Sequence, residues 1–169
     1  DVASYYPSLM LVYKWLSRNV HDPSKYAEIY HTRLKLKAEK NPMQQPYKIV
    51  LNSTYGAMKD KHNAMYDPRQ ANNVCVGGQL LLLDLIERLE DHCEIIQSNT
   101  DGILVKLRRY EDFEMLDDLC WEWEQRTGMR LEFDEFQKVY QKDVNNYLWA
   151  VVPYYFLVWY NLSTVTTGI

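Results

Sequence analysis

The sequence predicts an α+β fold in which a mostly antiparallel sheet is covered by helices. Two observations lead to this prediction. Segments with helical apolar spacing are followed by short runs of β-branched residues, and turn residues separate the two kinds of segment. The chain of 169 residues is 47% hydrophobic, which is enough apolar material for the core of one domain of ordinary size.

The first half of the chain predicts helices. Residues 1–4 are expected to end a strand and enter a turn, and Pro7 suits the first position of a helix that continues over residues 8–16. Asp22-Pro23-Ser24 is a turn and a helix start. Residues 26–40 and 46–58 favour two helices, and Asn41-Pro42 breaks the chain between them. We therefore expect a short antiparallel helix pair.

The second half combines helices and strands. A nearly all-round apolar helix is expected over residues 79–91, after Gly77-Gly78, and is interpreted as a core helix. Apolar runs at residues 95–96 and 103–105 flank Asn99-Thr100-Asp101-Gly102, a pattern typical of a β-hairpin. Residues 110–127 predict an amphipathic helix that ends at Gly128, and two strands are expected over residues 131–140 and 146–152.

Composition narrows the class of protein. The net charge of -4 argues against a strongly basic nucleic-acid-binding module, but cations concentrate between Lys25 and Lys48. Three cysteines without a CxxC pair predict reduced thiols in an intracellular protein. The apolar run 147–162 contains Pro153 and is short for a membrane span, so buried strands are expected there and no membrane partner.

Three short segments together supply the aspartates, tyrosines and asparagines of the candidate site. Residues 1–8 read DVASYYPS, residues 48–56 read KIVLNSTYG, and residues 99–101 read NTD. In order and spacing they resemble motifs A, B and C of family B DNA polymerases, which read DxxSLYPS, KxxxNSxYG and YxDTD. The resemblance covers roughly residues 1–152. This sequence departs from the pattern at Tyr5, at Gln97 and at Asn99, which replaces the first aspartate of motif C.

The resemblance implies the palm and fingers of a DNA-directed DNA polymerase. Residues 1–21 and 59–152 would form the palm, residues 22–58 the fingers, and residues 153–169 a tail of uncertain structure. Such an enzyme extends a DNA primer on a template with dNTPs. The short fingers resemble viral or phage members, which would place the protein in the host cytoplasm. We expect the sequence to be part of a longer chain with exonuclease and thumb domains, and to be inactive alone.

Nucleotidyl transfer of this kind uses two divalent ions. Mg²⁺ takes oxygen ligands from one or two carboxylates together with substrate phosphates. Asp1 at a strand end and Asp101 at a hairpin tip can converge at one edge of a sheet. The resemblance implies that Asp1, the backbone of Val2, and Asp101 hold two Mg²⁺ ions, for which Mn²⁺ could substitute. With Asn at position 99, the chain keeps Asp101, which the resemblance implies is the main metal ligand of motif C. It lacks the second negative charge that the family has at position 99.

The expected nucleotide site lies on the helix pair. Arg33 and Lys37 are four residues apart and therefore share one helix face, and Lys48 comes from the next helix, so that the three could neutralise a triphosphate. By the resemblance, Tyr6 would stack under the sugar and exclude a 2′-hydroxyl, and backbone N–H groups near Ser4 and Tyr5 would cradle phosphate. The remaining contacts, to the nascent base pair, would come from Asn52, Tyr55 and Gly56.

A further element of the family, KxY, grips the primer strand. Lys138-Val139-Tyr140 fits its letters, Asn145-Asn146-Tyr147 lies nearer its expected place, and Lys142 could supply a substitute cation. Both assignments stay open. So do two other functions. One is a non-catalytic polymerase-like module that binds nucleic acid or a partner. The other is an RNA-synthesising or reverse-transcribing palm, which shares the carboxylate pair but not KxxxNSxYG.

Overall fold

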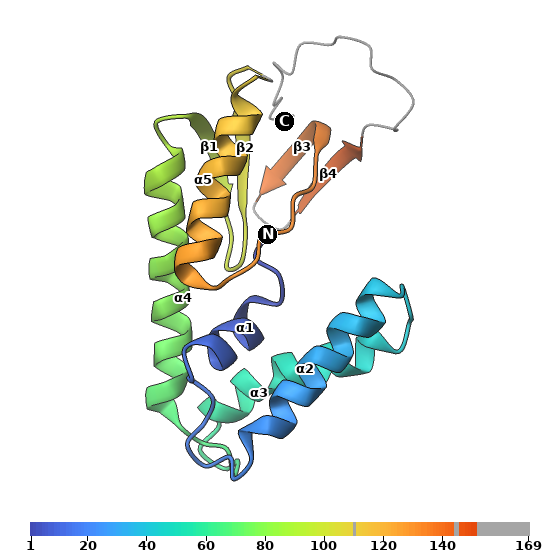
Figure 1. Ribbon diagram of the computed structural model, residues 1–169, viewed down its shortest axis with the longest axis vertical. Helices are drawn as coiled ribbons and strands as arrows, with labels where there is room; N and C mark the ends of the chain where they lie inside the picture. Colours follow the sequence, from blue (N-terminus) through green and yellow to red (C-terminus); the bar gives the residue numbers. More distant parts are fainter. Residues whose placement is uncertain (110, 144–145, 152–169) are drawn as a thin grey trace.

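The computed structural model describes residues 1–109, 111–143 and 146–151 (Figure 1). The long helix α4 runs beside α5 and the first pair of strands, while α2 and α3 project from the other end of the molecule. The described elements are helices α1 (Tyr5–Val12), α2 (Pro23–Ala38), α3 (Gln44–Lys59), α4 (Pro68–Leu89) and α5 (Asp112–Thr127), and strands β1 (Cys93–Ser98), β2 (Ile103–Leu107), β3 (Phe136–Asp143) and β4 (Asn146–Val151).

The predicted helix pair is confirmed, with earlier starts. Helix α2 begins at Pro23 because the Asp22 side chain caps it, accepting a hydrogen bond of 3.0 Å from the Ser24 N–H. The Tyr26 hydroxyl donates to the Leu51 carbonyl at 3.1 Å and joins α2 to α3. The first helix differs from its prediction. It begins at Tyr5, so that Pro7 is its third residue, and it ends at Val12.

The predicted start of α4 is wrong, because the helix begins at Pro68 and runs through the glycine pair. A Cβ at Gly77 would overlap the Trp15 ring, and one at Gly78 would lie 3.1 Å from Leu9 Cδ1. Small residues therefore let the first part of the chain pack closely on α4. The expectation of an all-round buried helix is also wrong, since Leu80 is 60% exposed and Leu83 is 48% exposed.

The α+β class with antiparallel strands is confirmed, but the described strands form two separate two-stranded sheets and not one. Strands β1 and β2 make the predicted hairpin, in which Ser98 faces Ile103 and the Asn99 N–H donates to the Gly102 carbonyl at 2.7 Å. Strands β3 and β4 make the second antiparallel pair, which begins later than the predicted residue 131.

Helix α5 packs on α4 through the predicted apolar face, where Leu116, Cys120 and Trp123 are buried. Gly128 ends α5 in the left-handed conformation, with φ 72°. The three cysteines are free thiols, as predicted. Across the described ranges, no helix has the length and apolar character needed to cross a membrane. Most of the run 147–162 and the tail 153–169 lie outside the described residues.

Candidate active site

The first three residues lie between the hairpin tip and the segment that follows α5. On one side, the Val2 N–H donates to the Asp101 carbonyl at 2.6 Å. On the other side, Val2 forms a β-bridge with Leu131, and Asp1 and Glu132 exchange backbone hydrogen bonds of 2.7 and 2.8 Å. The structure therefore brings Asp1 and Asp101 together across 100 residues of sequence.

Asp1 and Asp101 are the two acidic side chains that the sequence proposes as metal ligands, and they lie at this junction. Both are exposed, and the Asp1 carboxylate lies so close to Gly102 that a Cβ there would overlap Oδ1 and stand 3.0 Å from Cγ. No group of three or more histidine, cysteine or acidic side chains is placed to hold a metal in the described part of the chain. Two carboxylates are still sufficient for Mg²⁺ when phosphate oxygens and water complete its shell.

One face of α2 lies against motif A and the segment after α5. Tyr30, Arg33 and Lys37 follow helical spacing and make three successive contacts. The hydroxyls of Tyr30 and Ser8 are 3.0 Å apart, Arg33 donates to the Ser4 hydroxyl, and Lys37 pairs with Glu132. The two cations of α2 that the sequence predicts as triphosphate ligands thus contact Ser4 and Glu132, and Glu132 is joined to Asp1 by backbone hydrogen bonds.

Arg33 is an unusual residue in this row. Its side chain is buried, with 6% of its surface exposed, and its Nε has no hydrogen-bond partner among the described residues. Ser4, which accepts from Arg33, has φ 49° at the N-terminus of α1. A buried guanidinium with a free donor is costly unless another acceptor arrives. This arrangement suits an anion that approaches the start of α1.

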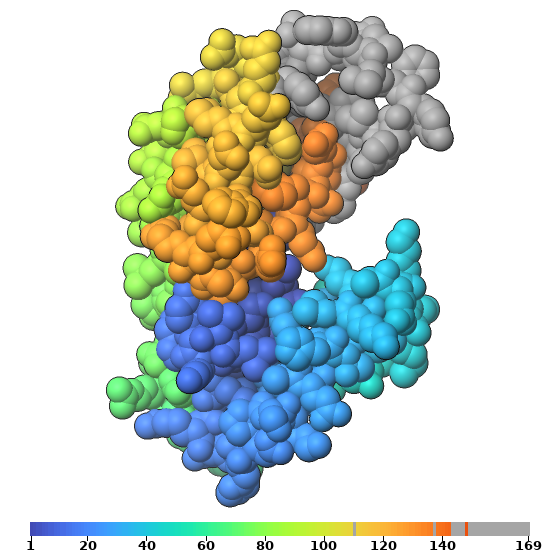
Figure 2. Space-filling view, viewed as in Figure 1, coloured from blue at the N-terminus to red at the C-terminus, as the bar shows by residue number. Residues whose placement is uncertain are grey.

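Helix α3 presents a second row toward solvent. Lys48, Asn52 and Gly56 recur every four residues and are all exposed, so they share one face of the helix. A Cβ at Gly56 would meet no atom within 4 Å, which shows open space beside it. Figure 2 shows the surface hollowed between the blue-to-cyan α2–α3 pair and the orange part of the molecule above it.

Three tyrosines of the predicted site differ in what their side chains can do. Tyr5 is buried and its hydroxyl donates to the Gly78 carbonyl at 2.6 Å, so only its backbone can face a ligand. The rings of Tyr6 and Tyr55 meet edge to face, with centroids 4.6 Å apart. The ammonium of Lys59 lies 5.3 Å from the centroid of the Tyr55 ring.

The environment raises the pKa of both facing tyrosines above the ordinary value. Burial raises the pKa of Tyr6, with further contributions from the Cys75 thiol and the Asp101 carboxylate. Burial also raises the pKa of Tyr55 to about 12, helped by a hydrogen bond with Cys75. Each ring therefore offers a neutral hydroxyl at physiological pH.

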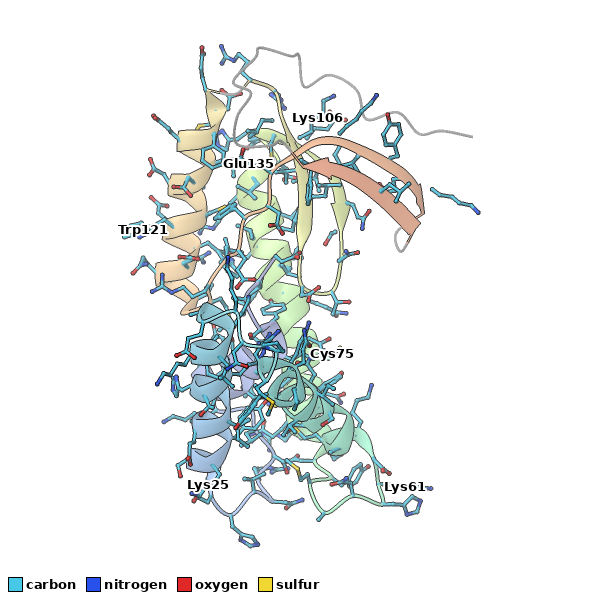
Figure 3. The ribbon with its side chains drawn as sticks, turned by 90° about the vertical axis from the view of Figure 1, so that its right-hand side faces the viewer. Lys25, Lys61, Cys75, Lys106, Trp121 and Glu135 are labelled. Carbon is cyan, nitrogen blue, oxygen red and sulfur yellow. The ribbon has the colours of Figure 1, made fainter. Side chains whose placement is uncertain are left out.

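A groove of about 420 Å³ extends from Tyr6 along α4 to the hairpin tip. Leu82, Leu83 and Ile86 supply its apolar wall, while Ser98, Asn99 and Thr100 supply polar groups. Cys75 also lines the groove and is labelled in Figure 3, where it lies beside α3. Asn99, the departure in motif C, thus faces this groove.

The residues expected to grip DNA lie on the second sheet. The Lys138 ammonium is 4.9 Å from the centroid of the Tyr140 ring, and Tyr140 is 45% exposed. Lys142 is exposed near the end of β3, and Tyr147 stands opposite Gln141 in β4. Asn145 lies outside the described residues, so the choice between the two KxY assignments stays open.

The sequence did not single out Glu132 or Cys75. Glu132 contacts Asp1 and Lys37, which are 131 and 95 residues away in the chain, so local spacing carries no signal for it. Cys75 lies in the part of α4 that was not predicted as helix. A correct prediction of that helix would have placed Cys75 one turn before Gly78 and Gln79.

Comparison with known proteins gives one distant relationship to report. DNA polymerase II of Escherichia coli (strain K12) is 29% identical to this chain over 97 residues, which is 56% of this chain and 12% of that protein. The match thus spans a small part of the relative. No protein-family model matches the sequence.

Proposed function

We propose that this chain forms the nucleotidyl-transfer site of a template-directed DNA polymerase similar to family B. The observation that carries the proposal is the meeting of Asp1 and Asp101 beside the cationic face of α2. The distant similarity to DNA polymerase II supports the same class of activity. The activity of the whole polymerase, its DNA and its dNTPs come to this chain as part of the proposal.

In the proposed reaction, the 3′-oxygen of a primer attacks the α-phosphorus of a dNTP. A new P–O bond forms, the bond from the α-phosphorus to the bridging oxygen breaks, pyrophosphate leaves, and the hydroxyl proton passes to solvent. Mg²⁺, or Mn²⁺ in its place, would activate the attacking hydroxyl and neutralise the leaving phosphates. Asp1, the Val2 backbone and Asp101 would hold two such ions.

The helix pair would position the triphosphate. Arg33 Nε has no hydrogen-bond partner in the part of the chain that the structure describes, and the side chain lies at the start of α1. Lys37 follows one turn later on the same face of α2. Lys48 would approach from α3. Backbone N–H groups of Ser4 and Tyr5 would add donors, because the N-terminus of a helix favours anions.

The aromatic pair would select the sugar and the base pair. Tyr6, braced by the edge of Tyr55, would form a wall that clashes with a 2′-hydroxyl. Asn52 and Gly56 lie on the exposed face of α3, where open space could admit a base pair. We assign the groove between Tyr6 and Asn99 to the primer terminus, and Lys138, Tyr140, Lys142 and Tyr147 to the primer strand behind it.

One observation favours a second function. Asn99 replaces a carboxylate of the motif, which suits a module that binds nucleic acid or a partner without catalysis. Primer extension by the full-length protein that carries this sequence separates the two. Template-directed incorporation that Asp101→Ala abolishes and Asp118→Ala leaves intact supports the polymerase. A full-length protein that binds primer–template but adds no nucleotide supports the binding module.

A further inference from the structure

The ion pair between Lys37 and Glu132 joins two distant parts of the chain. Their side chains are 40% and 51% exposed, and they come from α2 and from the segment after α5. Arg33, one turn earlier on α2, has a neutral partner in the Ser4 hydroxyl. Within the described part of the chain, Lys37 pairs with a carboxylate and Arg33 does not.

The backbone fixes Glu132 at the edge of the candidate metal site. Its N–H donates to the Asp1 carbonyl at 2.7 Å, and its own carbonyl accepts from the Asp1 backbone nitrogen at 2.8 Å. The position of Glu132 therefore depends on Asp1, while its side chain reaches Lys37. A carboxylate and a phosphate offer the same kind of anionic oxygen to an ammonium group. Glu132 thus occupies the donor that a triphosphate would need.

We propose that Glu132 tunes nucleotide affinity by competing with the triphosphate for Lys37. This inference rests on the proposed function, in which the α2 cations bind the triphosphate. A partly exposed ion pair is weak, so a highly charged triphosphate can displace the carboxylate. A ligand that does not reach Lys37 gains nothing from the exchange. Glu132 would thereby weaken the binding of every phosphate ligand that uses Lys37, and a ligand with more negative charge would compete better.

The competition can be measured without catalysis by calorimetric titration of dTTP into the 169-residue chain. Glu132→Gln removes the competing charge and keeps the shape of the side chain, so it is expected to bind dTTP about 2- to 5-fold more tightly than the wild type. Thymidine, which has no phosphate, is expected to bind both proteins equally.

Glu94→Gln is the matched control. Glu94 pairs with Lys106 at 3.5 Å across the open end of the hairpin, with exposed fractions of 61% and 33%, so the variant removes the same charge from a similar pair. It is expected to leave dTTP affinity unchanged. Glu132→Gln in a Lys37→Ala background is also expected to give no gain, because the contested donor is absent.

Three results would overturn the inference: no gain in Glu132→Gln, an equal gain in Glu94→Gln, or a gain that persists without Lys37. Failure of the proposed function looks different. In that case the full-length protein does not extend a primer, although Glu132→Gln still binds dTTP more tightly through Lys37. If the full-length protein extends a primer but Glu132→Gln does not change dTTP affinity, the proposed function stands and this inference is overturned.

Discussion

The Asp1 carboxylate lies directly against the α-carbon of Gly102, the residue that follows Asp101. With the Asp1 side chain in this position, a Cβ at residue 102 would overlap Asp1 Oδ1. Glycine therefore permits this close approach of Asp1, and its φ is not among the positive values. This contact places the Asp1 carboxylate beside the residue that follows Asp101.

Gly102→Ala is expected to displace the Asp1 side chain and disrupt the proposed cation site. The overlapping atom is the end of a side chain, which can swing away, so the fold should remain. We expect Mn²⁺ affinity to fall by about tenfold or more, in the range seen when groups that orient metal ligands are removed. Calorimetry measures the affinity and thermal unfolding measures the fold. Unchanged affinity would show that the contact does not position Asp1.

Gly56→Ala is expected to change stability and activity in opposite directions. Nothing lies within 4 Å of the added Cβ, and alanine in a helix interior is favoured over glycine by about 0.5–1 kcal/mol. The unfolding free energy should therefore rise, while primer extension by the full-length protein falls if a base pair uses this space. Urea unfolding and extension rates give the two values. A stabilised variant with full activity would refute the role of Gly56.

Asp67 links the loop before α2 to the start of α4 and predicts a pH-dependent stability. It is buried, accepts from Arg18 Nε and Nη2 at 2.9 Å each, and caps α4 through the Gln70 N–H. Hydrogen bonds from the Arg18 side chain hold the pKa of Asp67 well below its ordinary value, against the opposing effect of burial. The folded state therefore favours the charged carboxylate.

The sign of the effect follows from that lowered pKa. The stabilisation by Asp67 is complete above the ordinary aspartate range and is lost as the pH falls toward the folded value. Asp67→Asn keeps a capping group and should lower the unfolding free energy by about 1–3 kcal/mol at pH 7, a difference that shrinks below about pH 4. Asp118→Asn serves as an exposed control. A difference that does not vary with pH would contradict the assignment.

Tyr6→Ala is expected to relax the choice of sugar. The wall against a 2′-hydroxyl would be gone, and Tyr55 would lose the ring that it meets at 4.6 Å. The ratio of dNTP to rNTP incorporation by the full-length protein should fall about tenfold or more. Tyr66→Ala removes an exposed tyrosine outside the site and should leave the ratio unchanged. A constant ratio in Tyr6→Ala would refute its assigned role.

Local signals were enough for several elements of the fold. The Asp22 cap, the break at Asn41-Pro42, the hairpin turn at residues 99–102 and the stop at Gly128 depend on neighbouring residues, and each is present in the structure. The start of α4 carries the same local signal as α2, because Asp67 caps the helix and Pro68 lies in its first turn. Local signals do not show that the helix continues through the glycine pair. Gly77 disfavours a helix locally, but Trp15 covers it, and that packing becomes visible only after the chain has folded.

In the candidate site, too, some residues could be predicted from the sequence and others only from the folded chain. Motif spacing pointed to Asp1, Arg33, Lys37 and Asp101. In the structure, Asp101 and Arg33 contact residues of the segment 1–4, and Lys37 contacts Glu132, which is hydrogen-bonded to Asp1. The sequence could not show that Lys37 already has a partner in Glu132, because that contact spans 95 residues and no periodic pattern links its members. It also gave no reason for glycine at position 102 beyond its suitability for a turn.

The most direct test of the account is whether Asp1 and Asp101 hold one shared cation site. Mn²⁺ titration of the 169-residue chain in the presence of dTTP, followed by electron paramagnetic resonance, measures this without catalysis. We predict that Asp1→Asn and Asp101→Asn each weaken Mn²⁺ binding by about tenfold or more, whereas Asp118→Asn has no effect. Wild-type affinity in either of the first two variants would contradict the account.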